Sequence, residues 1–268
     1  MRYGECRWPE IEALDKDRVV VVVPIASLEQ HGYHLPLLTD TFLATTVAER
    51  VHDRMADRIL LTPTLWLGAS DHHLDFPGTI SVPNTVYVEI IKSVARSLVR
   101  AGFRRIFFLN GHGGNVAPGE TAITEVANSF DDCDEALIAL GSYWAIAGQA
   151  MKAETHGMTQ PTLTHACEYE TSMMLALHGH LVRMDLAHGH THGRVPASPG
   201  VRVAGRFHRM TASGALDTPE FATAEKGESL LSAIVEEVAA CVEQMLNWPP
   251  RHVLKPPCTP TLEGEEST

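Results

Sequence analysis

The chain has few of the features that mark secreted or membrane proteins. Its five cysteines lie far apart and form no C-x-x-C pair, which argues against a disulfide framework or a cysteine-based zinc site and favours a reducing compartment. No run reaches the ~18 apolar residues of a membrane span. The amino terminus, MRYGECRWPEIEALDKD, has no apolar segment of a secretory signal. We therefore expect a cytoplasmic protein.

Basic residues are also scarce. Twenty-one Lys and Arg stand against 33 Asp and Glu, which gives a formal net charge of -12. Such a balance disfavours binding to nucleic-acid phosphates or to an anionic membrane, so we expect neither as a partner. The composition, 44% hydrophobic and 20% charged, excludes a disordered, collagenous or coiled-coil chain. No repeat or low-complexity linker interrupts residues 1–248, which predicts a single domain followed by a loose tail over residues 249–268.

Alternating strands and helices are predicted from the apolar patterns. Residues 18–25 (RVVVVVPI) and 104–110 (RRIFFLN) each contain an apolar run without polar alternation, typical of strands buried on both faces of a parallel sheet. Further strands are expected at residues 58–63 and 136–141, and helices at residues 41–55, 86–102, 120–129, 168–177 and 225–248. Asp40 and Asn84 are the expected N-caps of the first two helices. This order predicts an α/β fold, a three-layer α/β/α sandwich with a mostly parallel central sheet.

Histidine is abundant, with 15 residues, and it is both the commonest metal ligand and the usual acid-base residue. Ligand crevices lie beyond the carboxyl ends of parallel strands, where Glu29, His31 and Asp40 of one loop can converge with His112 of another. Each alone has a simpler explanation, Asp40 as a helix cap and the others as solvated loop residues. A phosphate-binding loop at GHGGN is disfavoured, because the P-loop lysine is missing and Val116 replaces the last glycine of the dinucleotide motif. Together these residues favour a metal site.

Five segments, in this order, resemble the motifs of the creatininase (creatinine amidohydrolase) family: PIASLEQHGYHLPLLTD, GASDHHLDFPGTIS, NGHGGN, HACEYETSMML and ATAEKGE. The resemblance extends from Val19 to about Trp248. The family includes creatininase, a formamide deformylase of archaeal flavin and deazaflavin biosynthesis, and the peptidase that trims the mycofactocin precursor. The resemblance implies metal-dependent hydrolysis of a C–N bond in a small cyclic or linear amide.

A ligand set for two divalent ions is also implied by the resemblance. The residues expected around one ion are Glu29, Asp40 and His112, and those around the other are His31, Asp40 and Glu170. Asp40 stands in the place of a bridging carboxylate, and Glu168 is the rival of Glu170. Mixed nitrogen and oxygen ligands suit zinc first, with manganese or iron(II) as alternatives. A hydroxide bridging the ions would attack the amide carbonyl.

Other positions of the motifs receive roles from the resemblance. His165 is expected to relay a proton to the leaving nitrogen, although a loop histidine there could also have only local hydrogen bonds. His73 is expected to bind substrate. Trp144 lies outside these motifs, but it follows a predicted strand, and we expect it to form a wall of the pocket. His72 receives no role. Creatininase itself has a glutamate where this chain has Gly114, so creatinine is expected to be a poor substrate.

The partners implied are a small-molecule amide and further copies of the chain, in a homo-oligomer that we expect to be a hexamer. A peptidase of the mycofactocin type, acting on a small modified peptide, is the first alternative. A catalytically silent metal-binding or assembly protein is the second, but the five ligands and His165 weigh against it. The run from His188 to His192 resembles an accessory metal loop in composition, and an exposed turn is the preferred interpretation.

Overall fold

The protein is described here by a computed structural model, which covers residues 1–129, 136–189, 201 and 203–248. A parallel sheet of four strands lies at its centre, in the order β2-β1-β3-β4. The strands are β2 (Ile59–Leu61), β1 (Val20–Ile25), β3 (Arg105–Asn110) and β4 (Leu137–Ser142). Every residue of β1 and β3 is buried, and Ile25 pairs with Asn110 at their carboxyl ends. The two loops predicted to carry ligands therefore begin side by side.

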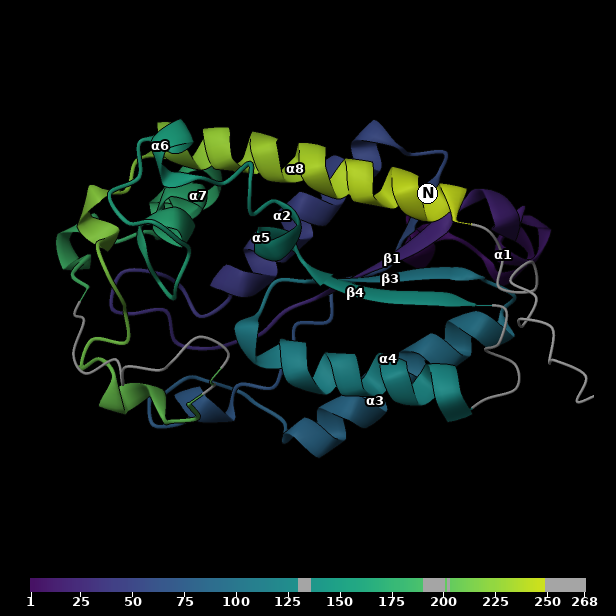
Figure 1. Cartoon of the computed structure of the whole chain (residues 1–268), viewed down its shortest axis with the longest axis horizontal. Helices are drawn as coiled ribbons and strands as arrows, with labels where there is room; N and C mark the ends of the chain where they lie inside the picture. The colour runs from purple at the N-terminus through teal and green to yellow at the C-terminus, as the bar shows by residue number, and fades with distance from the viewer. Residues whose placement is uncertain (130–135, 190–200, 202, 249–268) are drawn as a thin grey trace, which may run out of the picture.

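Helices cover both faces of the sheet (Figure 1). One layer contains α2 (Thr39–Arg54), α5 (Tyr143–Ile146), α6 (Ala153–His156), α7 (Glu168–His178) and α8 (Ala224–Asn247). The opposite layer contains α3 (Asn84–Arg100) and α4 (Val116–Ser129), and the short α1 (Trp8–Ala13) lies near the amino ends of the strands. The predicted three-layer sandwich with a parallel sheet is thus confirmed.

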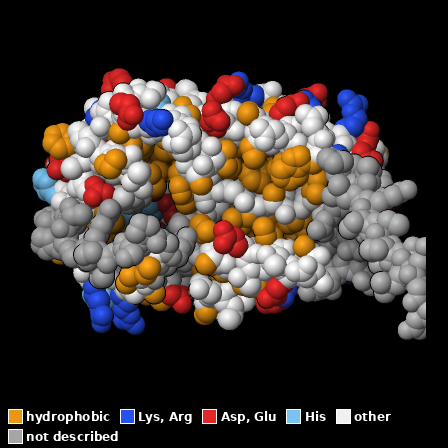
Figure 2. Space-filling model, viewed as in Figure 1, with side chains coloured by type: hydrophobic (Ala, Val, Ile, Leu, Met, Phe, Trp, Pro, Cys, Tyr) orange, Lys and Arg blue, Asp and Glu red, His pale blue; other side chains and the backbone are white. Residues whose placement is uncertain are grey.

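Two apolar cores, one on each face of the sheet, explain the unbroken apolar run of β1. Val20 and Val22 point into the core under α2, α7 and α8, whereas Val21 and Val23 point into the core under α3 and α4. A strand buried on both faces has no need of alternating polar residues. The edge strand β4 is only half-buried over most of its length, and Figure 2 shows apolar side chains at the surface between the two helix layers.

Helix starts are where the expectations from sequence were wrong. Asp40 is not the cap of α2, because the N-cap is Leu38 and Asp40 lies in the first turn with its side chain in the ligand cluster. Asn84 does not cap α3 either, since the N-cap position is Pro83. Helix α4 begins at Val116, well before the expected residue 120, because it leaves the glycine loop directly.

The carboxyl-terminal part of the chain concerns two further expectations, the end of the last helix and the loose tail. Helix α8 ends at Asn247, close to where the sequence predicted it to stop before the two prolines. The predicted tail, residues 249–268, lies outside the described part of the chain. Within that part, no helix is both long and apolar enough to cross a membrane.

Candidate metal centre

Carboxylates and imidazoles from four separate segments meet beyond the carboxyl ends of β1 and β3. One potential ligand atom from each of Glu29, Asp40 and His112 lies within 4.8 Å of the other two. The same holds for His31, Asp40 and Glu170. All five side chains are buried. The structure therefore brings together both ligand sets that the sequence predicted, and both contain Asp40.

Asp40 directs its two carboxylate oxygens at different imidazoles. Its Oδ1 lies 3.0 Å from Nε2 of His31, and its Oδ2 lies 2.9 Å from Nδ1 of His112. The hydroxyl of Ser27, just after β1, donates to Oδ2 at 2.8 Å and fixes the orientation of the carboxylate. Each carboxylate oxygen thus faces an imidazole of a different ligand set, and Asp40 could serve as a ligand in both sets.

Glu29 has one carboxylate oxygen among imidazoles and one without a partner. Its Oε1 lies 3.3 Å from Nδ1 of His112 and 3.4 Å from Nε2 of His73. Its Oε2 is buried and accepts no hydrogen bond from any residue that the structure describes. A buried carboxylate oxygen is destabilising unless a donor or a cation satisfies it. The oxygen and imidazole donors of this cluster are of the type that zinc, manganese and iron(II) prefer, so the residues fit such ions.

The electrostatics of the cluster also favour bound positive charge. Burial alone would raise the pKa of Asp40, but the charge of His31 and the hydrogen bonds from His112 and His31 outweigh burial and lower it. Burial opposes protonation of His31, yet Asp40 raises its pKa to about 9. His112 behaves in the same way, because Glu29 and Asp40 overcome its burial and raise its pKa. Carboxylates that stabilise protonated imidazoles in this way would also stabilise divalent cations that take the place of those protons.

Of the two glutamates proposed as fifth ligand, the structure brings only Glu170 to the cluster. Its Oε2 accepts a hydrogen bond from the backbone N–H of Ala166 at 2.5 Å, and burial raises its pKa. Glu168 lies on the same helix, but its Oε1 forms a 2.6 Å ion pair with Lys226. Its Oε2 accepts from the N–H and the hydroxyl of Thr159, at 2.8 and 2.7 Å. Glu168 thus joins α7 to the start of α8, away from the ligand cluster.

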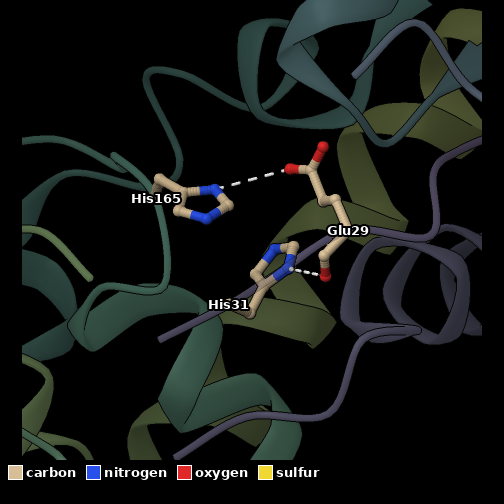
Figure 3. A group of neighbouring side chains, drawn as sticks. All are labelled: Glu29, His31 and His165. Carbon is tan, nitrogen blue, oxygen red and sulfur yellow. Dashed lines mark hydrogen bonds and ion pairs between the residues drawn. The ribbon is translucent and has the colours of Figure 1, made fainter. Parts of the chain in front are cut away.

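His165 lies at the cluster itself (Figure 3). Its Nδ1 is 3.6 Å from Oε1 of Glu29, and it forms a third group of potential ligand atoms with Glu29 and His31. Its Nε2 is 2.9 Å from the backbone carbonyl of Gln30. Burial, with a further contribution from the charge of His31, lowers the pKa of His165 to about 3. A neutral ring that donates from Nε2 to this carbonyl presents the lone pair of Nδ1 to the cluster.

A cavity of about 270 Å³ opens over these residues. His73 and Trp144, predicted to contact substrate, both line it. Sequence reasoning missed Phe207, whose ring lies 4.3 Å from the ring of His73, and gave no role to His72, which also lines the cavity. Phe207 lies in a segment without a recognisable motif, so no local signal identified it. His72 could have been noticed, because it is adjacent to His73 in the HH pair.

Gly114 is packed so tightly that no side chain fits there. A Cβ atom at this position would lie 2.2 Å from the carbonyl oxygen of Ala69 and 2.4 Å from Nε2 of His112. The glutamate of creatininase itself therefore has no room in this backbone arrangement. The histidine-rich run is described only at its start, where His188 is exposed, and residues 190–192 lie outside the described ranges.

The chain is similar to known proteins over most of its length. The profile of the family Creatininase, described as creatinine amidohydrolase, matches residues 4–242. Creatinine amidohydrolase of Pseudomonas putida is 29% identical over 260 residues, which cover 92% of this chain and 97% of that protein. Mycofactocin precursor peptide peptidase of Mycobacterium tuberculosis H37Rv is 32% identical over 241 residues, 86% of each chain.

Solved structures give the same result for the fold. A mutant creatininase of the Zn–Zn type superposes with a TM-score of 0.76 at 29% identity, covering 93% of this chain and 98% of that one. A manganese creatininase superposes with a TM-score of 0.73 at 29% identity, covering 93% and 99%. Sequence profile, relatives and architecture all agree, and the chain belongs to the creatininase family.

Proposed function

We propose that the protein is a dinuclear metal-dependent amidohydrolase that cleaves a C–N bond of a small cyclic or linear amide. The observation that carries the proposal is the pair of buried ligand sets that share Asp40. Glu29 and His112 would complete the set for one ion, and His31 and Glu170 the set for the other. The related creatininase structures are described as a Zn–Zn type and a manganese form, which supports two divalent ions here. Zinc is the first choice, and manganese or iron(II) are the alternatives.

Two divalent ions would supply a water molecule that ionises near neutral pH and a Lewis acid for the amide carbonyl. Residues of the chain would transfer the proton and position the substrate. Nε2 of His165 lies 2.9 Å from the carbonyl oxygen of Gln30, so the tautomer with its proton on Nε2 would donate there and leave Nδ1 as a proton acceptor at the cluster. His165 would take the proton of the attacking water and deliver it to the departing nitrogen, because an amide anion is a poor leaving group. His73 and Trp144 would form walls against which the substrate is positioned.

A peptidase that acts on a small modified peptide is the second candidate. It is favoured by the 32% identity to mycofactocin precursor peptide peptidase. Both candidates use the same cluster and differ in what enters the cavity. Creatinine would be a poor substrate in either case.

A metal assay combined with a substrate screen tests the proposal. The protein, purified without chelator, should contain up to two divalent ions per chain by mass spectrometry of the elements. The loaded protein should hydrolyse at least one of the compounds in a panel of creatinine, formamides, lactams, lactones and short peptides, and chelation should abolish the activity. Peptide-only hydrolysis would select the second candidate. A protein that binds no metal, or that binds metal and cleaves nothing, would contradict the enzymatic proposal.

We further propose that the chain assembles as a homo-oligomer, with a hexamer favoured, in which a neighbouring chain helps to close the pocket. This proposal rests on the family alone. Light scattering coupled to size-exclusion chromatography measures the molar mass directly. A monomeric mass at micromolar concentration would refute it.

A further inference from the structure

Four histidines line the cavity, and His72 differs from the other three. Each of the others has both ring nitrogens close to polar atoms of the protein. The contacts are those of His112 with Asp40 and Ser70, of His73 with Gln30 and Glu29, and of His165 with Gln30 and Glu29. His72 forms no hydrogen bond or ion pair with any residue in the part of the chain that the structure describes, and it belongs to none of the three ligand groups found there.

Contacts with neighbouring rings hold the ring of His72 in place, and its nitrogen atoms take no part in them. It lies 4.2 Å from the ring of His73 and is stacked on the ring of His112, with centroids 5.7 Å apart and planes inclined by 19°. The missing side chain at Gly114 leaves room for it, since a Cβ there would lie 2.8 Å from Cε1 of His72. The side chain is therefore ordered by ring contacts, and its nitrogens stay available.

The backbone that carries His72 is fixed as well. It lies in a single 3-10 turn, Asp71–His73. The hydroxyl of Ser81 accepts from the N–H of Ser70 and donates to Oδ1 of Asp71, both at 2.7 Å. The start of the turn is thus tied to the segment at Ser81, and His72 is presented to the cavity as a preorganised group.

We propose that His72 binds a second polar group of the substrate, a carbonyl or an N–H placed next to the amide that is cleaved. An imidazole nitrogen at the wall of a cavity exchanges water for a polar group of the ligand when the ligand enters, and a ligand that lacks the matching group leaves it unsatisfied. The substrate class is then a small amide with a second hydrogen-bonding group on the same ring or chain, and not a simple alkyl amide. This inference rests on the proposed function, because it concerns the same cavity.

Two ring compounds of equal size test the inference. Succinimide differs from 2-pyrrolidinone by one carbonyl group in place of one methylene. Their dissociation constants would be measured by calorimetry on the zinc-loaded protein and on the variants His72→Ala, His72→Gln and His180→Gln. His180 is an exposed histidine outside the cavity and serves as the matched control.

The original protein and the His180→Gln variant should bind succinimide about tenfold more tightly than 2-pyrrolidinone, the value of one net hydrogen bond. His72→Ala should remove the preference without changing the zinc content, and His72→Gln, which keeps a donor and an acceptor, should retain part of it. No preference in the original protein, equal loss on both compounds, or loss of zinc from His72→Ala would each overturn the inference. Failure of the proposed function has a different signature, since the binding preference would persist while no amide is hydrolysed.

Discussion

Replacing the shared carboxylate should remove both ions at once. Asp40 belongs to both sets of potential ligands, so Asp40→Ala takes a ligand from both. A ligand at a hundred times its dissociation constant stabilises the folded state by about 2.7 kcal/mol, so two independent sites contribute about 5 kcal/mol. At about 2 to 4 °C per kcal/mol for a domain of this size, added zinc should raise the melting temperature of the original protein by about 10 to 20 °C.

Thermal unfolding of each variant with chelator and with zinc measures this difference. The zinc-dependent shift should vanish in Asp40→Ala. It should fall to about half in Glu170→Gln, because Glu170 belongs to one set only. Asp185→Ala is the control, since that carboxylate is exposed and pairs with Arg183 on the surface, and its shift should equal that of the original protein. If Asp40→Ala kept more than half of the shift, the shared-ligand arrangement would be wrong.

Three further predictions follow from the contacts around the cluster. Ser27→Ala removes the hydroxyl that orients Asp40 and should weaken zinc binding about 10- to 100-fold in a competition titration without changing the stoichiometry; unchanged affinity would refute this role. His165→Ala should keep its zinc but lose about 10² to 10⁴ in rate, with a smaller loss on an activated anilide that needs less help from an acid; loss of zinc would instead identify His165 as a ligand. Glu168→Ala should keep both ions and lower the free energy of unfolding by about 1 to 3 kcal/mol in urea titrations, because it removes the buried acceptor of Lys226 and Thr159. A variant that lost zinc would restore Glu168 as a candidate ligand.

The sheet and the ligand cluster could be predicted from the sequence for a definite physical reason. Strands buried on both faces leave an unbroken apolar run, and the loops that follow such strands meet at one edge of the sheet. Asp40 and His112 could therefore be placed together although they are far apart in sequence. The choice of Glu170 over Glu168 came from the family motif, and the ion pair of Glu168 with Lys226 is the contact that sequence alone could not show.

The helix starts and the residues of the cavity wall were harder to predict from the sequence. The start of α4 was predicted too late, because glycine and alanine give no apolar periodicity there. Asp40 satisfied the local pattern of a helix cap, and only the long-range contacts with the histidines show its other orientation. Phe207 reaches the cavity through packing against His73 and His165, which no local pattern encodes.

The tight packing at Gly114 limits how an enzyme of this type can diverge. A glutamate at this position would first require the carbonyl of Ala69 and the rings of His72 and His112 to move. The exchange of glycine for glutamate is therefore epistatic: it can succeed only together with changes in the loop that carries Ala69 and His72. Directed evolution that varies residue 114 alone should yield inactive or misfolded variants, whereas a library that varies residues 69–72 at the same time opens the route to the other specificity.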